Sequence, residues 1–153
     1  MILSKNIDNV LLLASKKLPW YSVTMERADK LGIILKAHSS PNTLEIRCGF
    51  TLLRYFNSSI EFLPTTQLHT PDMRVVRKNQ LWEIKDIKGN SKNTISHNLS
   101  EAKKQSENVV ITLYSTKMTP KSAIGRLKSE LKKTPSIKKC LVVTKTEKVI
   151  KVK

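Results

Sequence analysis

Apolar residues recur at helical spacing in the first part of the chain, three and four positions apart over residues 4–18. Residues 22–37 repeat this pattern more weakly. The polar run SSPN at residues 39–42 combines residue types that are typical of loops and turns. We therefore predict an N-terminal helical extension over residues 1–40, followed by a separate domain over residues 41–153.

The rest of the chain alternates between helical patterns and short apolar runs that are typical of strands. Ser40 and Pro41 suit the N-cap and first position of a helix, and Lys78 and Asn79 suit the turn of a β-hairpin. This order predicts an α/β fold in which helices flank a mixed central sheet. The predicted helices span residues 41–56, 94–106 and 120–133, and the predicted strands span residues 60–64, 73–76, 81–87, 108–114, 137–144 and 149–152.

The length of 153 residues allows a hydrophobic core without disulfides or structural metals. No apolar run is long enough to span a membrane, and the N-terminus has no secretory pattern, so we expect a cytoplasmic protein. Cys48 and Cys140 have neither metal-ligand spacing nor a secreted context. We therefore expect both thiols to be reduced and buried.

Charge is the strongest compositional feature. The chain has 28 Lys and Arg against 12 Asp and Glu, which gives a formal net charge of +16. Residues 117–153 carry 12 basic and 2 acidic side chains, so this last quarter of the chain accounts for +10 of the excess. Such an excess opposes compaction by self-repulsion, and a polyanionic partner relieves it. We predict binding to nucleic acid, ahead of a solvated basic surface and of an acidic membrane surface.

Candidate chemistry lies on the predicted hairpin, in the sequence TPDMRVVRKNQLWEIKDIKG at residues 70–89. Side chains alternate along a strand, so Glu83 and Lys85 point to one face. Trp82 and Ile84 then point to the other face, into the core under a helix. The sequence therefore predicts an acidic and a basic group side by side on one face of the second hairpin strand.

Asp72 extends this pair. The predicted hairpin places Asp72 opposite about Lys85, and residue 74 or 75 opposite Glu83. Metal-dependent phosphodiester hydrolysis needs carboxylates that hold a hard cation such as Mg²⁺ and a group that orients the attacking water. Taken alone, a Glu and a Lys two positions apart on a strand more often form a surface ion pair. The combination with a nearby aspartate favours the catalytic interpretation.

A Pro-Asp pair, a spacer of ten residues and then EIK resemble the signature of the PD-(D/E)xK nuclease superfamily. The resemblance implies Asp72 and Glu83 as metal ligands and Lys85 as the residue that supports the attacking water. In that superfamily an acidic residue on the preceding helix often completes the site, and Glu45 is the acidic residue of the helix predicted over residues 41–56. The implied cofactor is a divalent metal, Mg²⁺ first, with Mn²⁺ or Zn²⁺ as alternatives.

The chain from Thr43 onward is similar to a narrower group, the C-terminal tRNase domains of the contact-dependent growth inhibition toxin CdiA. The similarity lies in NTLEIR, EFLP, TPD, LWEIKDIKGNSKNTI, EAKKQSENVVITL, TKM and IKKCLVVTK. It implies a restriction-endonuclease-like fold, tRNA as substrate ahead of DNA, and an immunity protein as partner. Residues 1–40 have no counterpart in that module, so we expect either a stand-alone relative or a separated, delivered toxin domain. Asp86 is expected to be a bystander, because it lies on the opposite strand face from Lys85.

Further residues are candidates for binding nucleic acid. A basic loop precedes the helix predicted over residues 94–106, where free backbone N–H groups can hold a phosphate. Gln105 on that helix can reach the site, His97 is a candidate acid or base, and the basic helix after residue 120 can follow backbone phosphates. These nucleic-acid-binding candidates are Lys88, Ser91, Lys92, Thr94, His97, Gln105, Arg126 and Lys128.

Three functional interpretations stay open at this point. The first is a metal-dependent endonuclease that cleaves tRNA, with Glu45, Asp72, Glu83 and Lys85 as catalytic residues. The second is a metal-independent, barnase-like ribonuclease that uses His97 with Lys85 and a loop hydroxyl. The third is a basic nucleic-acid-binding protein without catalysis. The first is favoured because the chain has fewer well-placed histidines than metal-independent chemistry prefers.

Overall fold

The computed structural model describes residues 32–153, so the helix predicted over residues 4–18 lies outside the described residues. The described helices are α3 (Thr43–Phe56), α4 (Lys92–Ala102) and α5 (Pro120–Lys132), with a 3₁₀ turn, η1, at Val76–Lys78. The described strands are β1 (Ile33–Leu35), β2 (Ile60–Phe62), β3 (Met73–Val75), β4 (Gln80–Asp86), β5 (Asn108–Thr112), β6 (Lys139–Val143) and β7 (Val149–Lys151).

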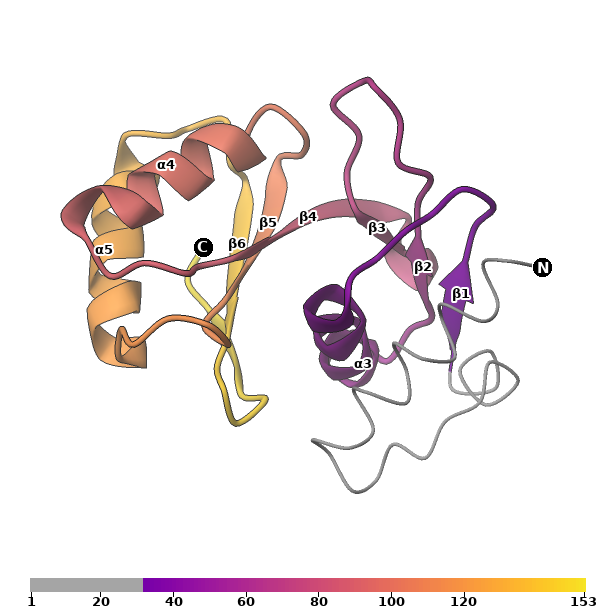
Figure 1. Cartoon of the computed structure of the whole chain (residues 1–153), viewed down its shortest axis with the longest axis horizontal. Coiled ribbons are helices and arrows are strands. Elements are labelled where there is room, and N and C mark those ends of the chain that lie inside the picture. Colours follow the sequence, from indigo (N-terminus) through magenta and orange to yellow (C-terminus); the bar gives the residue numbers. More distant parts are fainter. Residues whose placement is uncertain (1–31) are drawn as a thin grey trace.

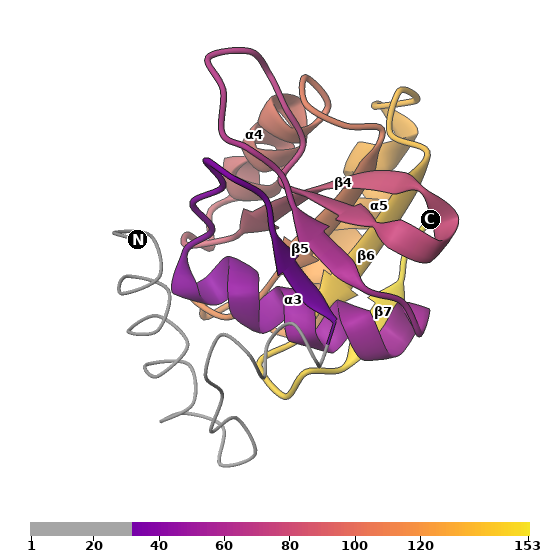
Figure 2. The same cartoon turned by 90° about the vertical axis from the view of Figure 1, so that its right-hand side faces the viewer.

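The strands form one mixed sheet in which they follow one another in chain order from β1 to β7. The pairs β1–β2, β4–β5 and β5–β6 are parallel, and the other three pairs are antiparallel. Helix α3 covers one face of the sheet, and α4 and α5 cover the other (Figures 1 and 2). The predicted α/β fold with helices on both sides of a mixed sheet is confirmed.

Two hydrophobic clusters fill the space between these layers. The first lies between α3 and the sheet and includes Leu52, Phe62 and Trp82, each at most 1% exposed. The second lies between the sheet and the helices α4 and α5, and includes Leu99 and Leu127. The strand β5 contributes to both clusters, Val110 to the first and Val109 and Ile111 to the second, because its side chains alternate between the faces. The predicted burial of Trp82 under a helix is confirmed.

Helix α3 begins after Asn42. The Asn42 side chain accepts a hydrogen bond from the Glu45 N–H at 2.9 Å, and the Glu45 carboxylate accepts one from the Asn42 N–H at 3.0 Å. This reciprocal capping box satisfies two backbone donors that the helix start would leave unpaired. The prediction of Ser40 as N-cap is wrong, because the asparagine with a glutamate three residues later makes the better cap. The Ser40 hydroxyl instead lies 3.1 Å from that of Thr65.

Strand β1 corrects the helix predicted over residues 22–37. Residues 33–35 pair in parallel with β2, and Ile33 is buried against it. Gly32 precedes the strand with φ of 93°, a conformation that favours glycine and that a continuing helix does not contain. Residues 33–35, near the end of the predicted extension, therefore belong to the sheet. A separate N-terminal extension before residue 41 otherwise stays a prediction.

The predicted hairpin is confirmed, with a different register. Met73 lies opposite Trp82 and Val75 opposite Gln80, which places Asp72 opposite Glu83. The prediction that Asp72 faces about Lys85 is wrong by two residues. The reason is the 3₁₀ turn η1, which centres the hairpin one residue earlier than a two-residue turn at Lys78 and Asn79 would. Asn79 ends this turn with φ of 49°.

The remaining elements follow their sequence signals. Thr119 caps α5 by accepting from the Ser122 N–H, and Pro120 occupies its first turn as predicted. Cys48 and Cys140 are free and buried, as expected. Among the described residues, no helix is long and apolar enough to cross a membrane.

Candidate active site

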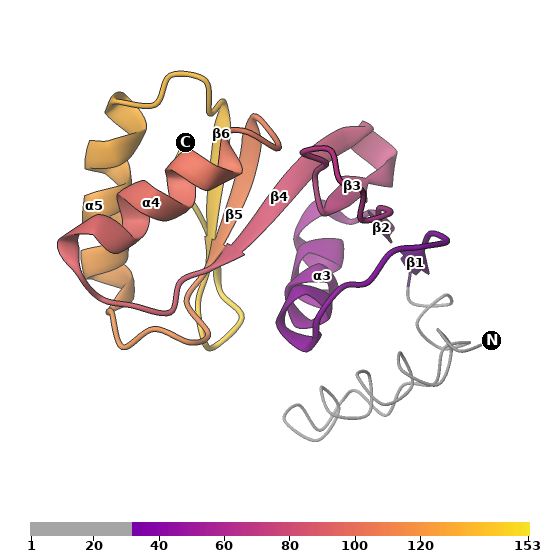
Figure 3. The same ribbon diagram turned by 45° about the horizontal axis from the view of Figure 1, so that its top comes forward.

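The sheet changes partners within β4, and the candidate site lies at that point. β4 pairs with β3 through residues 80–82 and with β5 through residues 83–86. Figure 3 shows β4 as the long strand that joins these two parts of the sheet. Asp72 lies just before β3, and its carboxylate accepts a hydrogen bond from the Ile84 N–H at 2.8 Å. The strand arrangement therefore holds Asp72 beside Glu83.

Asp72 and Glu83 present their carboxyl groups to each other and share a hydrogen bond. Glu83 is only 1% exposed. Burial, followed by the charge of Asp72, raises the pKa of Glu83 from 4.5 to about 8. Burial also raises the pKa of Asp72, against the opposing effects of the Ile84 N–H, the Glu83 carboxyl and the Lys85 charge. At neutral pH the pair therefore retains a proton that two exposed carboxylates would release.

Two polar side chains approach Glu83. The Lys85 Nζ lies 2.7 Å from Glu83 Oε1. The amide orientation of Gln105 follows from its partners: its nitrogen donates to the two Glu83 oxygens at 2.8 and 2.9 Å and to the Thr70 carbonyl at 3.1 Å. The structure thus places Gln105, which follows α4, at the carboxylate pair.

Glu45 approaches from the first turn of α3. Burial and the charge of Asp72 raise the pKa of Glu45 to about 7, while the Asn42 backbone hydrogen bond and the Lys85 charge oppose that rise. Its carboxylate also accepts from the Asn42 side-chain amide at 3.1 Å. Glu45 is therefore electrostatically part of the site and at the same time part of the helix cap. We call Glu45, Asp72, Glu83, Lys85 and Gln105 the carboxylate site.

The carboxylate site offers carboxylate oxygens, the type of ligand that a hard divalent cation prefers. The charge of Asp72 contributes to the raised pKa values of both Glu45 and Glu83, and a hydrogen bond joins Asp72 to Glu83, where a cation could neutralise both. Within residues 32–153, no group of three or more His, Cys, Asp or Glu side chains is arranged to hold a metal ion as it stands. Of the three carboxylates, Glu45 is the least available to a cation, because both of its oxygens accept hydrogen bonds from Asn42.

A groove of about 260 Å³ leads to the carboxylate site. It is lined by the loop of residues 63–72 and by Gln105. Leu68 in this loop is 78% exposed, and His69 is exposed beside it. The groove gives a solvent-side ligand access to Asp72.

The other predicted nucleic-acid-binding residues lie away from Gln105. Lys88, Ser91 and Lys92 are exposed at the N-terminal end of α4, whereas Gln105 follows its C-terminal end. The 11 residues of α4 span about 16 Å at a rise of about 1.5 Å per residue. The loop before α4 therefore lies about one helix length away from Gln105.

Several of these residues have structural contacts. The hydroxyl groups of Ser91 and Thr94 lie 3.0 Å apart. Arg126 on α5 donates from one guanidinium nitrogen to the carbonyls of Asn90 and Ser91, both at 3.0 Å. His97 and Lys128 are exposed on α4 and α5. Their roles in binding nucleic acid stay predictions.

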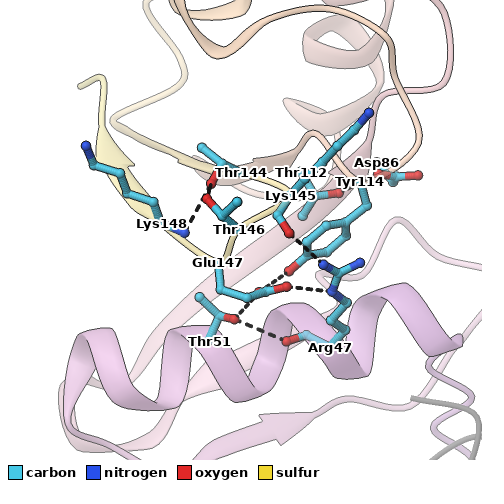
Figure 4. A network of polar contacts seen from close by, with 10 residues as sticks. All are labelled: Arg47, Thr51, Asp86, Thr112, Tyr114, Thr144, Lys145, Thr146, Glu147 and Lys148. Carbon is cyan, nitrogen blue, oxygen red and sulfur yellow. Dashed lines mark hydrogen bonds and ion pairs between the residues drawn. The ribbon is translucent and has the colours of Figure 1, made fainter. Parts of the chain in front are cut away.

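A second polar cluster, absent from the sequence-based prediction, joins α3 to the β6–β7 hairpin (Figure 4). The Arg47 Nε donates to Glu147 Oε1 at 2.5 Å, and the Tyr114 hydroxyl donates to Glu147 Oε2 at 2.8 Å. Thr51 also donates to Glu147 Oε2. The Arg47 guanidinium lies 3.9 Å from the centroid of the Tyr114 ring. We call these four residues the anchor cluster.

Asp86 also has a structural contact set. It accepts from Thr112 Oγ1 at 2.8 Å and from the Ser115 hydroxyl, and both donors lie on or after β5. These bonds hold the end of β4 to the β5 segment. Its position agrees with the expectation that it lies outside the carboxylate site.

Comparisons with known proteins agree with this fold and region. The sequence pattern described as the contact-dependent growth inhibition CdiA C-terminal domain matches residues 69–149, which include Asp72, Glu83 and Lys85 but not Glu45. Among solved structures, the fold is similar to a chain of a CdiA-CT/CdiI toxin and immunity complex from Burkholderia pseudomallei. That similarity has a TM-score of 0.54 and 16% identity, over 80% of this chain and 99% of the other. No curated protein matches the sequence.

Proposed function

Because the chain belongs to the contact-dependent growth inhibition CdiA C-terminal domain family, we propose that it is a toxin-type nuclease that hydrolyses phosphodiester bonds in RNA, with tRNA as its substrate class. The observation that carries the proposal is the Asp72–Glu83 pair, in which Asp72 is half-buried and Glu83 is buried, with Lys85 at 2.7 Å from Glu83 and Gln105 beside it. Buried carboxyl groups with strongly raised pKa values cluster at functional sites. The net charge of +16 supports a polyanionic substrate.

We expect Asp72 and Glu83, joined by Glu45, to hold a divalent cation, Mg²⁺ first. Carboxylate oxygens are the ligands that such hard cations prefer. When bound, the ion polarises a phosphate oxygen and lowers the pKa of a bound water. The raised pKa values of Glu45 and Glu83, about 7 and about 8, support this assignment because a bound cation would stabilise the charged carboxylates.

The protein groups around the pair have separate roles in this proposal. The Ile84 N–H fixes one oxygen of Asp72, and the Gln105 amide orients the Glu83 carboxyl group through both of its oxygens. The Lys85 ammonium is placed to orient an attacking water or to stabilise charge that develops on the phosphate. Burial removes water from these groups, which strengthens each of these electrostatic interactions.

An immunity protein is the expected protein partner. The similar solved chain comes from a complex whose title names a toxin and an immunity protein. A cell that produces an active tRNase needs such an inhibitor. Co-expression with a candidate immunity protein is therefore expected to be required for production of the active chain.

The test is cleavage of tRNA by the purified chain with Mg²⁺ and with excess chelator. Glu83→Gln keeps the shape of the side chain and removes its charge, so we expect cleavage to fall by about 10³-fold or more. Glu130→Gln is the matched control, because Glu130 pairs with Lys133 on the outer helix α5 and should tolerate the change. Cleavage by Glu83→Gln at the wild-type rate would contradict the proposal. Cleavage that resists chelator and disappears in His97→Ala would favour the metal-independent ribonuclease.

A further inference from the structure

Three hollows of the surface share lining residues and so form one path. The groove at the loop of residues 63–72 shares Pro71 and Gln105 with a second groove of about 560 Å³. That second groove shares Gln80 and Lys139 with a third hollow of about 380 Å³. The path therefore starts beside the carboxylate site and ends on the α3 face of the sheet.

The second groove is strongly basic, and we call it the lysine groove. Lys103 and Lys104 after α4, and Lys138 and Lys139 at the start of β6, line it together with a single acidic residue, Glu107. Lys104 pairs with Glu101 at 3.0 Å. Within the part of the chain that the structure describes, Lys103 and Lys139 have no ion-pair partner. Lysine charges without acidic partners, such as those of Lys103 and Lys139, fit the phosphates of a polynucleotide backbone.

The third hollow has an aromatic lining, and we call it the aromatic pocket. Tyr55, Phe56 and Trp82 line it, with ring centroids of neighbouring members 5.0 and 5.4 Å apart. Tyr55 is 45% exposed, so its ring is available for stacking. Trp82 is 1% exposed, and its indole N–H has no hydrogen-bond partner among the described residues. Trp82 therefore forms the buried floor of the aromatic pocket, and Tyr55 is its exposed ring.

Basic side chains also surround the aromatic pocket. Lys139 and three further lysines, Lys78, Lys151 and Lys153, line it, and the Lys78 Nζ lies 5.7 Å from the centroid of the Phe56 ring. Aromatic rings with adjacent positive charges suit a nucleotide, which combines a flat base and a phosphate. An acidic peptide would use the lysines but would leave the exposed Tyr55 ring without a stacking partner.

We propose that an unpaired strand of the substrate RNA leaves the carboxylate site beside Gln105, follows the lysine groove and places a base against Tyr55 in the aromatic pocket. This inference rests on the proposed nuclease function. Trp82 and Glu83 alternate along β4, so the aromatic pocket and Glu83 lie on opposite faces of the sheet. The RNA strand therefore passes around the ends of β4 and β6 at Gln80 and Lys139, the two residues that both hollows share.

The first experiment measures binding of a fluorescent single-stranded RNA to the full chain carrying Glu83→Gln, which prevents cleavage. Adding Lys138→Glu and Lys139→Glu should weaken binding by about 10-fold or more and reduce the salt slope of log affinity by about 1.4, since each lost phosphate contact removes about 0.7. Lys148→Glu is the matched control, because Lys148 is an exposed residue at the other end of the same β6–β7 pair. Lys148→Glu should leave the salt slope of log affinity close to that of the Glu83→Gln chain.

The second experiment tests the base in the aromatic pocket. Tyr55→Ala should weaken binding by about 5- to 150-fold, whereas Tyr55→Phe, which keeps the ring, should bind like the background. The RNA is then varied by replacing one base at a time with an abasic nucleotide. At one position the abasic change should weaken binding to the background variant and have no further effect on Tyr55→Ala.

The outcomes separate this inference from the proposed function. If the wild-type chain cleaves RNA but neither the lysine pair nor Tyr55→Ala changes binding, the strand path is wrong and the nuclease function stands. If the lysine pair weakens binding but no abasic position couples to Tyr55, the placement of a base in the aromatic pocket is wrong. If the wild-type chain neither binds nor cleaves RNA, the proposed function fails together with the path.

Discussion

The anchor cluster and the carboxylate site both surround a carboxyl group with polar partners, and they treat it in different ways. In the anchor cluster, three donors point at Glu147: the guanidinium of Arg47 and the hydroxyl groups of Thr51 and Tyr114. In the carboxylate site, Glu83 faces a second carboxyl group, that of Asp72. Each cluster supplies a cation, Arg47 beside Glu147 and Lys85 beside Glu83, but the carboxylate site adds a second carboxyl group.

This difference indicates which cluster serves stability and which serves chemistry. A buried carboxylate with several donors and a cation is satisfied by the protein itself. A pair of facing carboxyl groups is destabilising unless a proton or a cation lies between them. Proteins retain such an arrangement where function needs it, because strained or unbalanced groups persist only when selection favours them. Substitutions in the two clusters should therefore separate activity from stability.

The largest expected effect is on activity. Asp72→Asn removes one of the two facing charges and should lower the rate of tRNA cleavage by about 10³-fold or more, because the remaining carboxylates bind a cation poorly. The fold should tolerate the change, since the asparagine carbonyl oxygen can still accept from the Ile84 N–H. Initial cleavage rates together with a thermal unfolding curve check both parts. A variant that unfolds as well as losing activity would contradict the assignment of Asp72 to chemistry.

The second prediction concerns the anchor cluster. Glu147→Ala leaves the Arg47 guanidinium without its carboxylate, in a pair whose side chains are only 16% and 14% exposed. Breaking a buried ion pair costs about 3–5 kcal/mol, so the melting temperature should fall by roughly 10 °C. Chemical denaturation with a linear extrapolation measures the loss. At a temperature where the variant is folded, its cleavage rate should stay within a few-fold of wild type, and a loss of 10³-fold would place Glu147 in the catalytic machinery.

The sequence predicted much of the fold because its signals are local. The alternation around WEIK, the Thr119-Pro120 helix start and the apolar runs of β5 and β6 each depend on neighbouring residues. Local signals also fixed which face of β4 carries Glu83 and Lys85. They did not fix the hairpin register, because a two-residue turn and the 3₁₀ turn at Val76–Lys78 differ by two residues in pairing while keeping every side chain on its face.

Long-range contacts explain what the sequence could not predict. Arg47 and Glu147 are 100 residues apart in the chain, and neither lies in a motif. The aromatic pocket combines the end of α3 with residues of β4, β6 and β7, so no segment carries its pattern. Glu45 was found only because a family resemblance indicated an acidic residue on that helix. Its second role follows from the reciprocal hydrogen bonds with Asn42, which form only once the helix start is folded.

The third prediction is a pH dependence of stability. The pKa of Glu83 is about 8 and that of Glu45 about 7 in the folded chain, above their ordinary value of 4.5. Between about pH 5 and pH 8 the unfolded chain therefore releases protons that the folded chain keeps, so stability falls as pH rises through this window. Thermal unfolding in chelator should show a melting temperature that decreases from pH 5 to pH 8. Well below pH 4.5 these two groups are protonated in both states and contribute no slope.

Two controls sharpen this pH prediction. Glu83→Gln removes the group with the higher pKa, so the decrease between pH 5 and pH 8 should become smaller. Mg²⁺ should raise the melting temperature more at pH 8 than at pH 5, because the cation binds the deprotonated carboxylates. A slope that is the same with and without Glu83 would show that other groups set the pH dependence.

The smallest expected effect concerns the start of α3, where Glu45 is part of the helix cap and of the carboxylate site. Asn42→Ala removes the cap acceptor of α3 and should lower the free energy of unfolding by about 1 kcal/mol, whereas Asn42→Ser, which can still accept from the helix N–H, should restore most of it. Glu45→Gln keeps a side-chain oxygen for the Asn42 N–H and removes the charge, so it should preserve stability and weaken cleavage. Urea titrations and cleavage rates on the three variants test this separation. If Glu45→Gln costs as much stability as Asn42→Ala and leaves cleavage unchanged, Glu45 serves the helix cap and the carboxylate site consists of Asp72 and Glu83 with their partners.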